Sequence, residues 1–193
     1  MEVEAPLIRV EKLALFRSAN ASGVPHLAPL SELRNQLLES AGDKNARPSS
    51  RIFISRSQTP SQSRSQRKIL NQEKVTALLE KEGFETVHPE TLPFREQIQL
   101  FSRASAIAGA HGAGIYNLLF APRSTPILEF YTHSWWDHAA CRISSLFEMP
   151  HFHLFSHSHD KEDNFFVSLQ DLNKILADIL PDVDITRGAE KVF

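Results

Sequence analysis

The sequence has a single cysteine, Cys141, and no long apolar run. One cysteine cannot form an internal disulfide framework or a zinc site built from several cysteines, which fits a reducing compartment. The first residues include acids where a secretory signal would be basic and then apolar, and no segment approaches the roughly 20 apolar residues of a membrane span. These absences predict a cytoplasmic protein without a membrane span.

Acidic residues are missing from one stretch in particular, between Lys44 and Gln72, although the whole chain has a formal charge of −2. The polar composition of residues 57–66 is typical of a solvated loop. Nucleic acid is disfavoured as a partner because no aromatic residue follows Phe53 among the basic ones. Besides a solvated loop and a nucleic-acid contact, a third interpretation of this basic stretch is that its cations bind a phosphate group. The stretch carries seven of them: Lys44, Arg47, Arg51, Arg56, Arg64, Arg67 and Lys68.

Strand and helix patterns alternate along the chain after residue 50. Short apolar runs predict strands, and amphipathic patterns predict helices. Gly83 is positioned to end one of these helices, and Pro93 to begin the next. This alternation predicts a Rossmann-like three-layer α/β sandwich with a mostly parallel sheet. The expected strands are 51–55, 85–88, 105–110, 125–130 and 151–155, with an additional edge strand at 164–167, and the expected helices are 69–82, 93–104, 115–120, 134–147 and 168–180.

The two ends of the chain contribute less to this pattern. Residues 1–50 show one helical pattern, at 30–39, followed by a linker-like segment, which is too little for a core of its own. We therefore expect a residual N-terminal segment at 1–50, the Rossmann-like domain at 51–182 and a tail at 183–193.

Ligands of an open parallel sheet bind beyond the carboxyl ends of its strands. Glycines there let the backbone approach a ligand, and the N–H groups at the start of a helix favour an anion, although the same glycines also suit a tight turn without any ligand. The chain lacks the GxGxxG and P-loop patterns, which disfavours dinucleotide and P-loop chemistry. Four positions at the ends of expected strands carry such chemistry: Arg56, His88, the turn His111-Gly112-Ala113-Gly114, and Glu129, which closes its strand.

Several segments together resemble the carboxyl-terminal half of glycosyltransferase family 61. They are RIFISR (51–56), Arg67 with ILNQEKV (69–75), the long segment 83–120 that includes HGAG, and PILEF (126–130). The resemblance implies one half of a GT-B fold. It also implies inverting, metal-independent transfer from a nucleotide sugar, usually UDP-linked, to a glycan or polysaccharide acceptor. In such folds the carboxyl-terminal domain holds the donor, and the amino-terminal domain contributes most of the acceptor site.

The resemblance and the strand ends together give a set of expected donor-binding residues. We expect Arg56 and Arg67 on the diphosphate, and a carboxylate at Glu129 could accept the two ribose hydroxyls. Asn117 either contacts the donor or braces the loop. The catalytic base is unknown, with His111 as a candidate, and no metal or other cofactor is expected. The full donor-binding set is Arg56, Arg67, His111, Gly112, Ala113, Gly114, Asn117 and Glu129.

Two metal-like patterns and one alternative function remain. Asp182-Val183-Asp184 imitates a DxD motif, but it follows the last helix rather than a core strand. His151, His153, His157 and His159, with His133 and His138 upstream, have spacings that suit a transition metal, but the sequence shows no cysteine or glutamate partner for them. The alternative function is a non-catalytic nucleotide-sugar-binding remnant, whose amino-terminal domain is missing or supplied by an oligomer partner.

Overall fold

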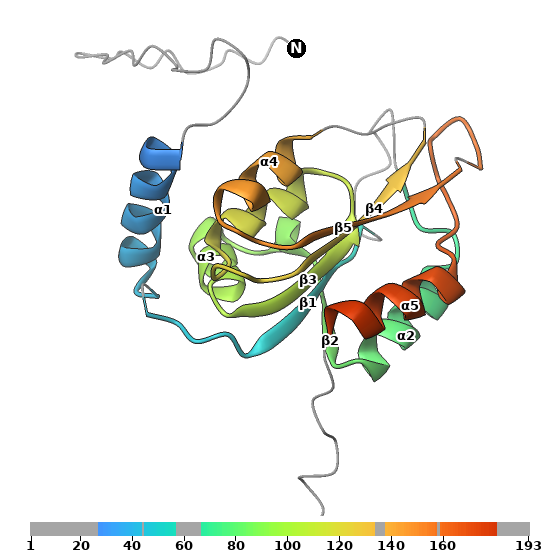
Figure 1. Cartoon of the computed structure of the whole chain (residues 1–193), viewed down its shortest axis with the longest axis horizontal. Coiled ribbons are helices and arrows are strands. Elements are labelled where there is room, and N and C mark those ends of the chain that lie inside the picture. The colour runs from blue at the N-terminus through green and yellow to red at the C-terminus, as the bar shows by residue number, and fades with distance from the viewer. Residues whose placement is uncertain (1–26, 44, 57–66, 134–137, 158, 181–193) are drawn as a thin grey trace, which may run out of the picture.

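The computed structural model describes residues 27–43, 45–56, 67–133, 138–157 and 159–180. It is an α/β sandwich in which one five-stranded, all-parallel sheet lies between helices (Figure 1). The Rossmann-like prediction is therefore confirmed. Within the described ranges, no helix combines the length and apolar character needed to cross a membrane. The expectations for Asp182, Asp184 and the tail at 183–193 concern residues outside these ranges.

The elements lie close to where the sequence pattern predicts them. Gly83 adopts a positive φ of 75° directly after one helix, as expected for a residue that ends it. Ser168 caps another helix by accepting a hydrogen bond from the Asp171 amide. The strands are β1 (Ser50–Ile54), β2 (Phe84–Val87), β3 (Ala104–Ala110), β4 (Ile127–Thr132) and β5 (His151–Ser156), and the α-helices are α1 (Leu27–Ala41), α2 (Gln72–Lys81), α3 (Phe94–Phe101), α4 (Ala139–Leu146) and α5 (Leu169–Ile179).

Two expectations for secondary structure are wrong. The expected edge strand at 164–167 forms only an isolated bridge between Phe165 and Ile69. The segment after β3 is a 3₁₀-helix, η2 (Ala113–Phe120), in place of an α-helix. A second short 3₁₀-helix, η1 (Pro89–Thr91), lies between β2 and α3.

The strand order is β2-β1-β3-β4-β5, which places a reversal in the middle of the sheet. The chain moves from β1 outward to β2, then crosses back to β3 and continues outward to β4 and β5. The point where the order reverses therefore lies between β1 and β3. In open parallel sheets the crevice outside the carboxyl ends of the strands at this point is the usual ligand site.

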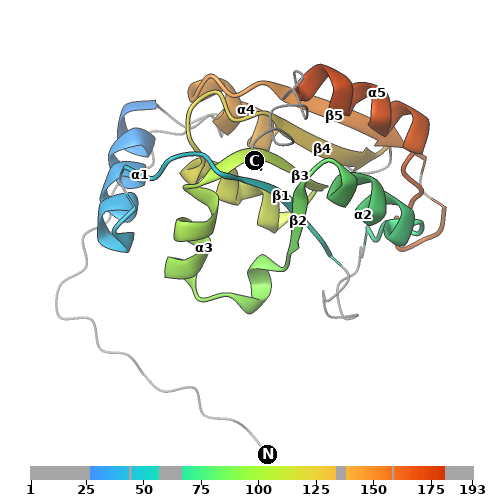
Figure 2. The same cartoon turned by 90° about the horizontal axis from the view of Figure 1, so that it is seen from below.

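Each face of the sheet has its own buried cluster, because successive strand residues point to opposite faces. Phe53 of β1 packs on the side of α2 and α5, whereas its neighbours Ile52 and Ile54 pack on the side of α3, η2 and α4. Figure 2 shows α2 and α5 next to one another on their side of the sheet. The sheet is thus covered on both faces, as a three-layer sandwich requires.

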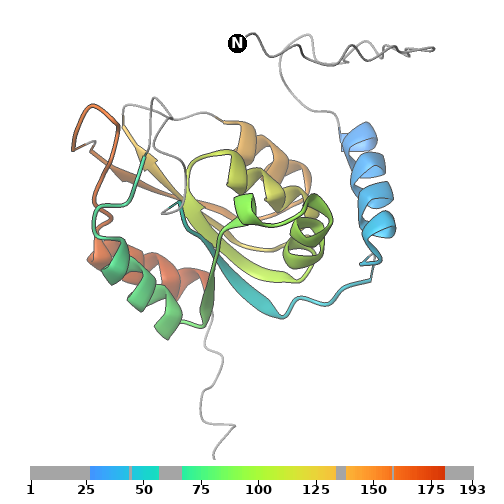
Figure 3. The same ribbon diagram turned by 180° about the vertical axis from the view of Figure 1, so that it is seen from behind.

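Helix α1 packs against the second of these layers, on the same side as α3 (Figure 3). Leu38 and Ala41 are buried there, and the Arg34 guanidinium donates hydrogen bonds to the carbonyls of Leu119 (2.8 Å) and Ala121 (2.9 Å). The core thus includes residues on the amino-terminal side of the expected domain start at residue 51.

Candidate functional site

Arg56 lies two residues beyond β1, and Gly112 lies two residues beyond β3, so both lie at the carboxyl edge where the strand order reverses. The Arg56 guanidinium packs directly over the Gly112 backbone, and a Cβ atom at position 112 would overlap its Nη1 atom. The same Nη1 donates a long hydrogen bond to the His111 carbonyl (3.4 Å). A side chain at position 112 would displace the Arg56 guanidinium from this position, a constraint that the HGAG pattern alone did not reveal.

A pocket of about 320 Å³ opens beside this contact. It brings together four of the expected donor-binding residues with side chains from η1 and α3 that sequence reasoning missed. Glu90 and Gln97 carry no recognisable motif, so only the path of the chain between β2 and β3 places them at the pocket. The lining residues are Ile54, Ser55, Arg56, Pro89, Glu90, Gln97, Ala113, Gly114 and Asn117.

The electrostatic environment of Arg56 links it to a second cation. Burial lowers the pKa of the Arg56 guanidinium, the positive charge of Arg67 lowers it further, and Glu90 acts in the opposite direction. Arginine stays charged in proteins despite such shifts. The structure therefore brings Arg56 and Arg67 near enough to repel each other, a repulsion that a bound anion would relieve.

Asn117 is anchored within the protein. Its amide nitrogen donates to Gln97 Oε1 (3.0 Å) and to the Gly114 carbonyl (3.2 Å), and little of its side chain is exposed. This geometry supports the bracing role, in which Asn117 holds the loop that contains Gly114 against α3. Direct contact between Asn117 and a donor stays a prediction.

Glu129 is completely buried in β4 and accepts three hydrogen bonds. The donors are His111 Nδ1 (2.7 Å), the Tyr131 hydroxyl (2.8 Å) and His151 Nε2 (3.0 Å). Burial by itself would raise the pKa of Glu129, but the hydrogen bonds from His111, His151 and Tyr131 outweigh it and lower that pKa to about 2. Glu129 is therefore ionised at neutral pH.

This network does not fit the ribose contact expected for Glu129, because the carboxylate has no exposed surface and both its oxygens already accept hydrogen bonds. The carboxylate instead holds the His111 ring, which also stacks on Tyr131 with centroids 4.8 Å apart. An ionised carboxylate can only accept, so His111 carries its proton on Nδ1. Glu129 thereby fixes the residue that precedes Gly112.

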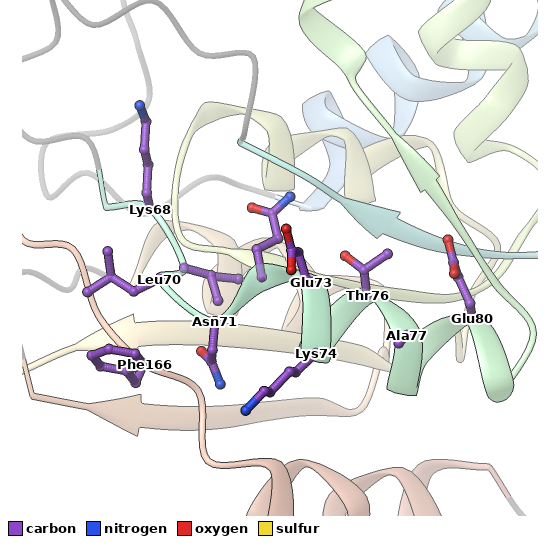
Figure 4. A pocket seen from close by; sticks show the side chains of 11 residues that line it. Lys68, Leu70, Asn71, Glu73, Lys74, Thr76, Ala77, Glu80 and Phe166 are labelled. Carbon is purple, nitrogen blue, oxygen red and sulfur yellow. The ribbon is translucent and has the colours of Figure 1, made fainter.

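A larger hollow, of about 920 Å³, lies over α2. Figure 4 shows Phe166, Leu70 and Asn71 gathered near the beginning of this helix, with Lys68 above them. The hollow adjoins the smaller pocket, because Gln72 Nε2 donates to the Ser55 hydroxyl (2.6 Å). The smaller pocket remains the candidate site, since it holds the residues at the strand reversal and this one does not.

Comparison with known proteins gives the class of this chain. The model of the family described as "Glycosyltransferase 61" matches residues 1–128. A segment of 63 residues, 33% of this chain, is 38% identical to a beta-1,2-xylosyltransferase (RCN11) of Oryza sativa subsp. japonica and covers 10% of that protein. A segment of 68 residues, 34% of this chain, is 37% identical to an EGF domain-specific O-linked N-acetylglucosamine transferase of Drosophila melanogaster and covers 13% of it.

The family match covers well over half of the chain, so the chain belongs to glycosyltransferase family 61. The match also includes the amino-terminal 50 residues, which the sequence resemblance had left out. The matched segments span only about a tenth of the length of the two curated relatives.

The Glu129 network predicts a specific acid sensitivity. A carboxyl group whose pKa falls from 4.5 to about 2 on folding stabilises the protein above pH 4.5, and this contribution disappears as the pH falls toward 2. The shift corresponds to about 3 kcal/mol. We expect the difference in unfolding free energy between the wild type and Glu129→Gln to shrink by about this amount between pH 5 and pH 2, measured by urea denaturation. A pH-independent difference would contradict it.

Proposed function

We propose that this chain binds the nucleotide-sugar donor for glycosyl transfer, with the diphosphate at the edge between β1 and β3. The observation that carries the proposal is the Arg56 guanidinium packed over Gly112, beside the 320 Å³ pocket. Transfer of a glycosyl group develops negative charge on the departing diphosphate, and preorganised positive groups stabilise that charge. Arg56 supplies one such group at the position where ligands of this fold bind.

The second cation and the loop backbone complete the proposed phosphate site. Arg67 acts on Arg56 through its charge, and we expect one anion to contact both guanidinium groups. The loop from Gly112 to Gly114 leads into η2, where backbone N–H groups at the start of a helix favour an anion. Ala113 and Gly114 line the same pocket as Arg56, which supports their role as backbone donors.

His111, which is 3% exposed and does not line the pocket, remains our candidate for the base that removes the acceptor proton in an inverting displacement. Its Nδ1–H donates a hydrogen bond to Glu129, so in the neutral ring the lone pair lies on Nε2. A carboxylate that orients an imidazole through Nδ1 is the arrangement that prepares a histidine for general-base catalysis. Glu129 then acts as a positioning residue in place of the ribose ligand expected from the sequence.

The finer parts of the proposal rest on family membership and on the charges at the pocket. We assign the chain to one half of a GT-B enzyme that uses a UDP-linked donor without a metal ion and a glycan or polysaccharide acceptor. The two curated relatives are named for transfer of xylose and of N-acetylglucosamine, both of which are glycosyl transfers. Arg56 at the pocket, with the charge of Arg67 acting on it, supports charge neutralisation by side chains.

The phosphate site predicts the effect of removing its central cation. Arg56→Ala should weaken UDP binding by about ten-fold or more, because a charge-assisted hydrogen bond contributes about 1.5–3 kcal/mol. Isothermal titration calorimetry measures the affinity. Arg123→Ala is the matched control. Arg123 precedes the start of β4, at the edge of the sheet opposite the pocket, and forms an exposed ion pair with Glu148. Equal affinities in the two variants would contradict the proposal.

The proposed metal-independent phosphate site predicts a second result. We expect the affinity for UDP to stay within about two-fold when Mg²⁺ or Mn²⁺ is added, because Arg56 and Arg67 already neutralise the diphosphate. The measurement is the same calorimetric titration with and without the cation at constant ionic strength. An increase in affinity with either cation would assign the phosphate charge to a metal.

A further inference from the structure

Three side chains with metal-binding atoms meet between α4 and the edge strand β5. Cys141 lies on α4, and His151 and His153 lie two residues apart on β5. One ligand atom from each lies within 4.8 Å of the other two. We propose that these three residues bind a zinc ion, at a site separate from the phosphate pocket but connected to it through the Glu129 network.

The spacing fits a tetrahedral ion after a small adjustment. Zinc–sulfur and zinc–nitrogen bonds of about 2.3 and 2.0–2.1 Å place neighbouring ligand atoms about 3.3–3.6 Å apart. The ligand atoms of this cluster are at most 4.8 Å apart, so side-chain rotations that move these atoms by about 1 Å bring them to zinc-binding distances. A thiolate with two imidazoles is a donor set that favours zinc over magnesium or calcium, which prefer oxygen ligands.

His151 is already oriented as a zinc ligand should be. Its Nε2–H donates to the Glu129 carboxylate (3.0 Å), so the lone pair of the neutral ring lies on Nδ1. Nδ1 faces α4, where the Ser144 hydroxyl lies 2.8 Å away. The same hydroxyl also lies 2.9 Å from the Cys141 carbonyl, so it keeps a hydrogen-bond partner if a metal takes Nδ1. A carboxylate on the far nitrogen is the usual support of a metal-bound histidine.

His153 supplies a second observation that points to a ligand. Its Nε2 atom is buried and has no hydrogen-bond partner within the part of the chain that the structure describes. Ligation by zinc would satisfy this nitrogen.

The three side chains leave a fourth coordination position, which a water molecule can occupy. The sequence showed the histidines without a partner, because Cys141 precedes them on a different element and only the packing of α4 beside β5 brings the thiol to them.

The test uses the full chain, because Cys141 is its single cysteine and every thiol measurement reports on that residue alone. The protein is stripped with a chelator and then titrated with Zn²⁺ or Co²⁺. We expect one equivalent of Co²⁺ to give a thiolate-to-cobalt charge-transfer band, and one equivalent of Zn²⁺ to slow alkylation of the thiol by about ten-fold or more. Absence of the band, or of the protection, would overturn the proposal.

Matched histidine variants locate the site. His153→Gln should lose both signals, whereas His157→Gln should keep them, because His157 lies beyond the end of β5 and outside the cluster. Circular dichroism checks that each variant is folded. Should His153→Gln fail to fold, Cys141→Ser replaces it, with the zinc bound per chain measured by elemental analysis. Protection that survives in His153→Gln, or zinc that stays bound to Cys141→Ser, would contradict the assignment.

Discussion

The hydrogen bonds that the buried Glu129 carboxylate accepts fix the arrangement of side chains at the carboxyl edge of the sheet. A charge without solvent exposure costs several kcal/mol unless hydrogen bonds satisfy it, so the three donors around Glu129 are a requirement of the fold. One of them, His111, precedes Gly112 directly, and its carbonyl accepts from Arg56. The position of the pocket's central cation is thus tied through His111 to a carboxylate in the core. A second donor, His151, extends the same network to β5 and α4.

This network explains how a small domain holds the Arg56 guanidinium in place. Arg56 and Arg67 repel each other, and side chains of this length lose considerable conformational freedom when they are fixed. Packing of Arg56 over a glycine limits its freedom before a ligand arrives, so less of that cost falls on binding. Arg56 lies at the carboxyl edge where the strand order reverses, the usual ligand site of an open parallel sheet.

The fold and part of the site could be predicted from the sequence, because they depend on local patterns. Apolar runs and helix-ending residues such as Gly83 fixed the order of the elements, and Arg56 was placed correctly at a strand end. The role of Glu129 could not be predicted, since its three donors come from positions that only the fold brings together. The same reason hid Gln97 at the pocket and Cys141 beside the histidines, because side chains without a motif are recognised only by their neighbours.

The central claim is that a nucleotide diphosphate binds at the edge between β1 and β3. A crystal structure of the full chain with UDP tests it most directly. The account predicts phosphate density in contact with the Arg56 guanidinium and the backbone of Gly112 to Gly114, with Glu129 still buried against His111. Density for the phosphates elsewhere, for example in the larger hollow over α2, would contradict it.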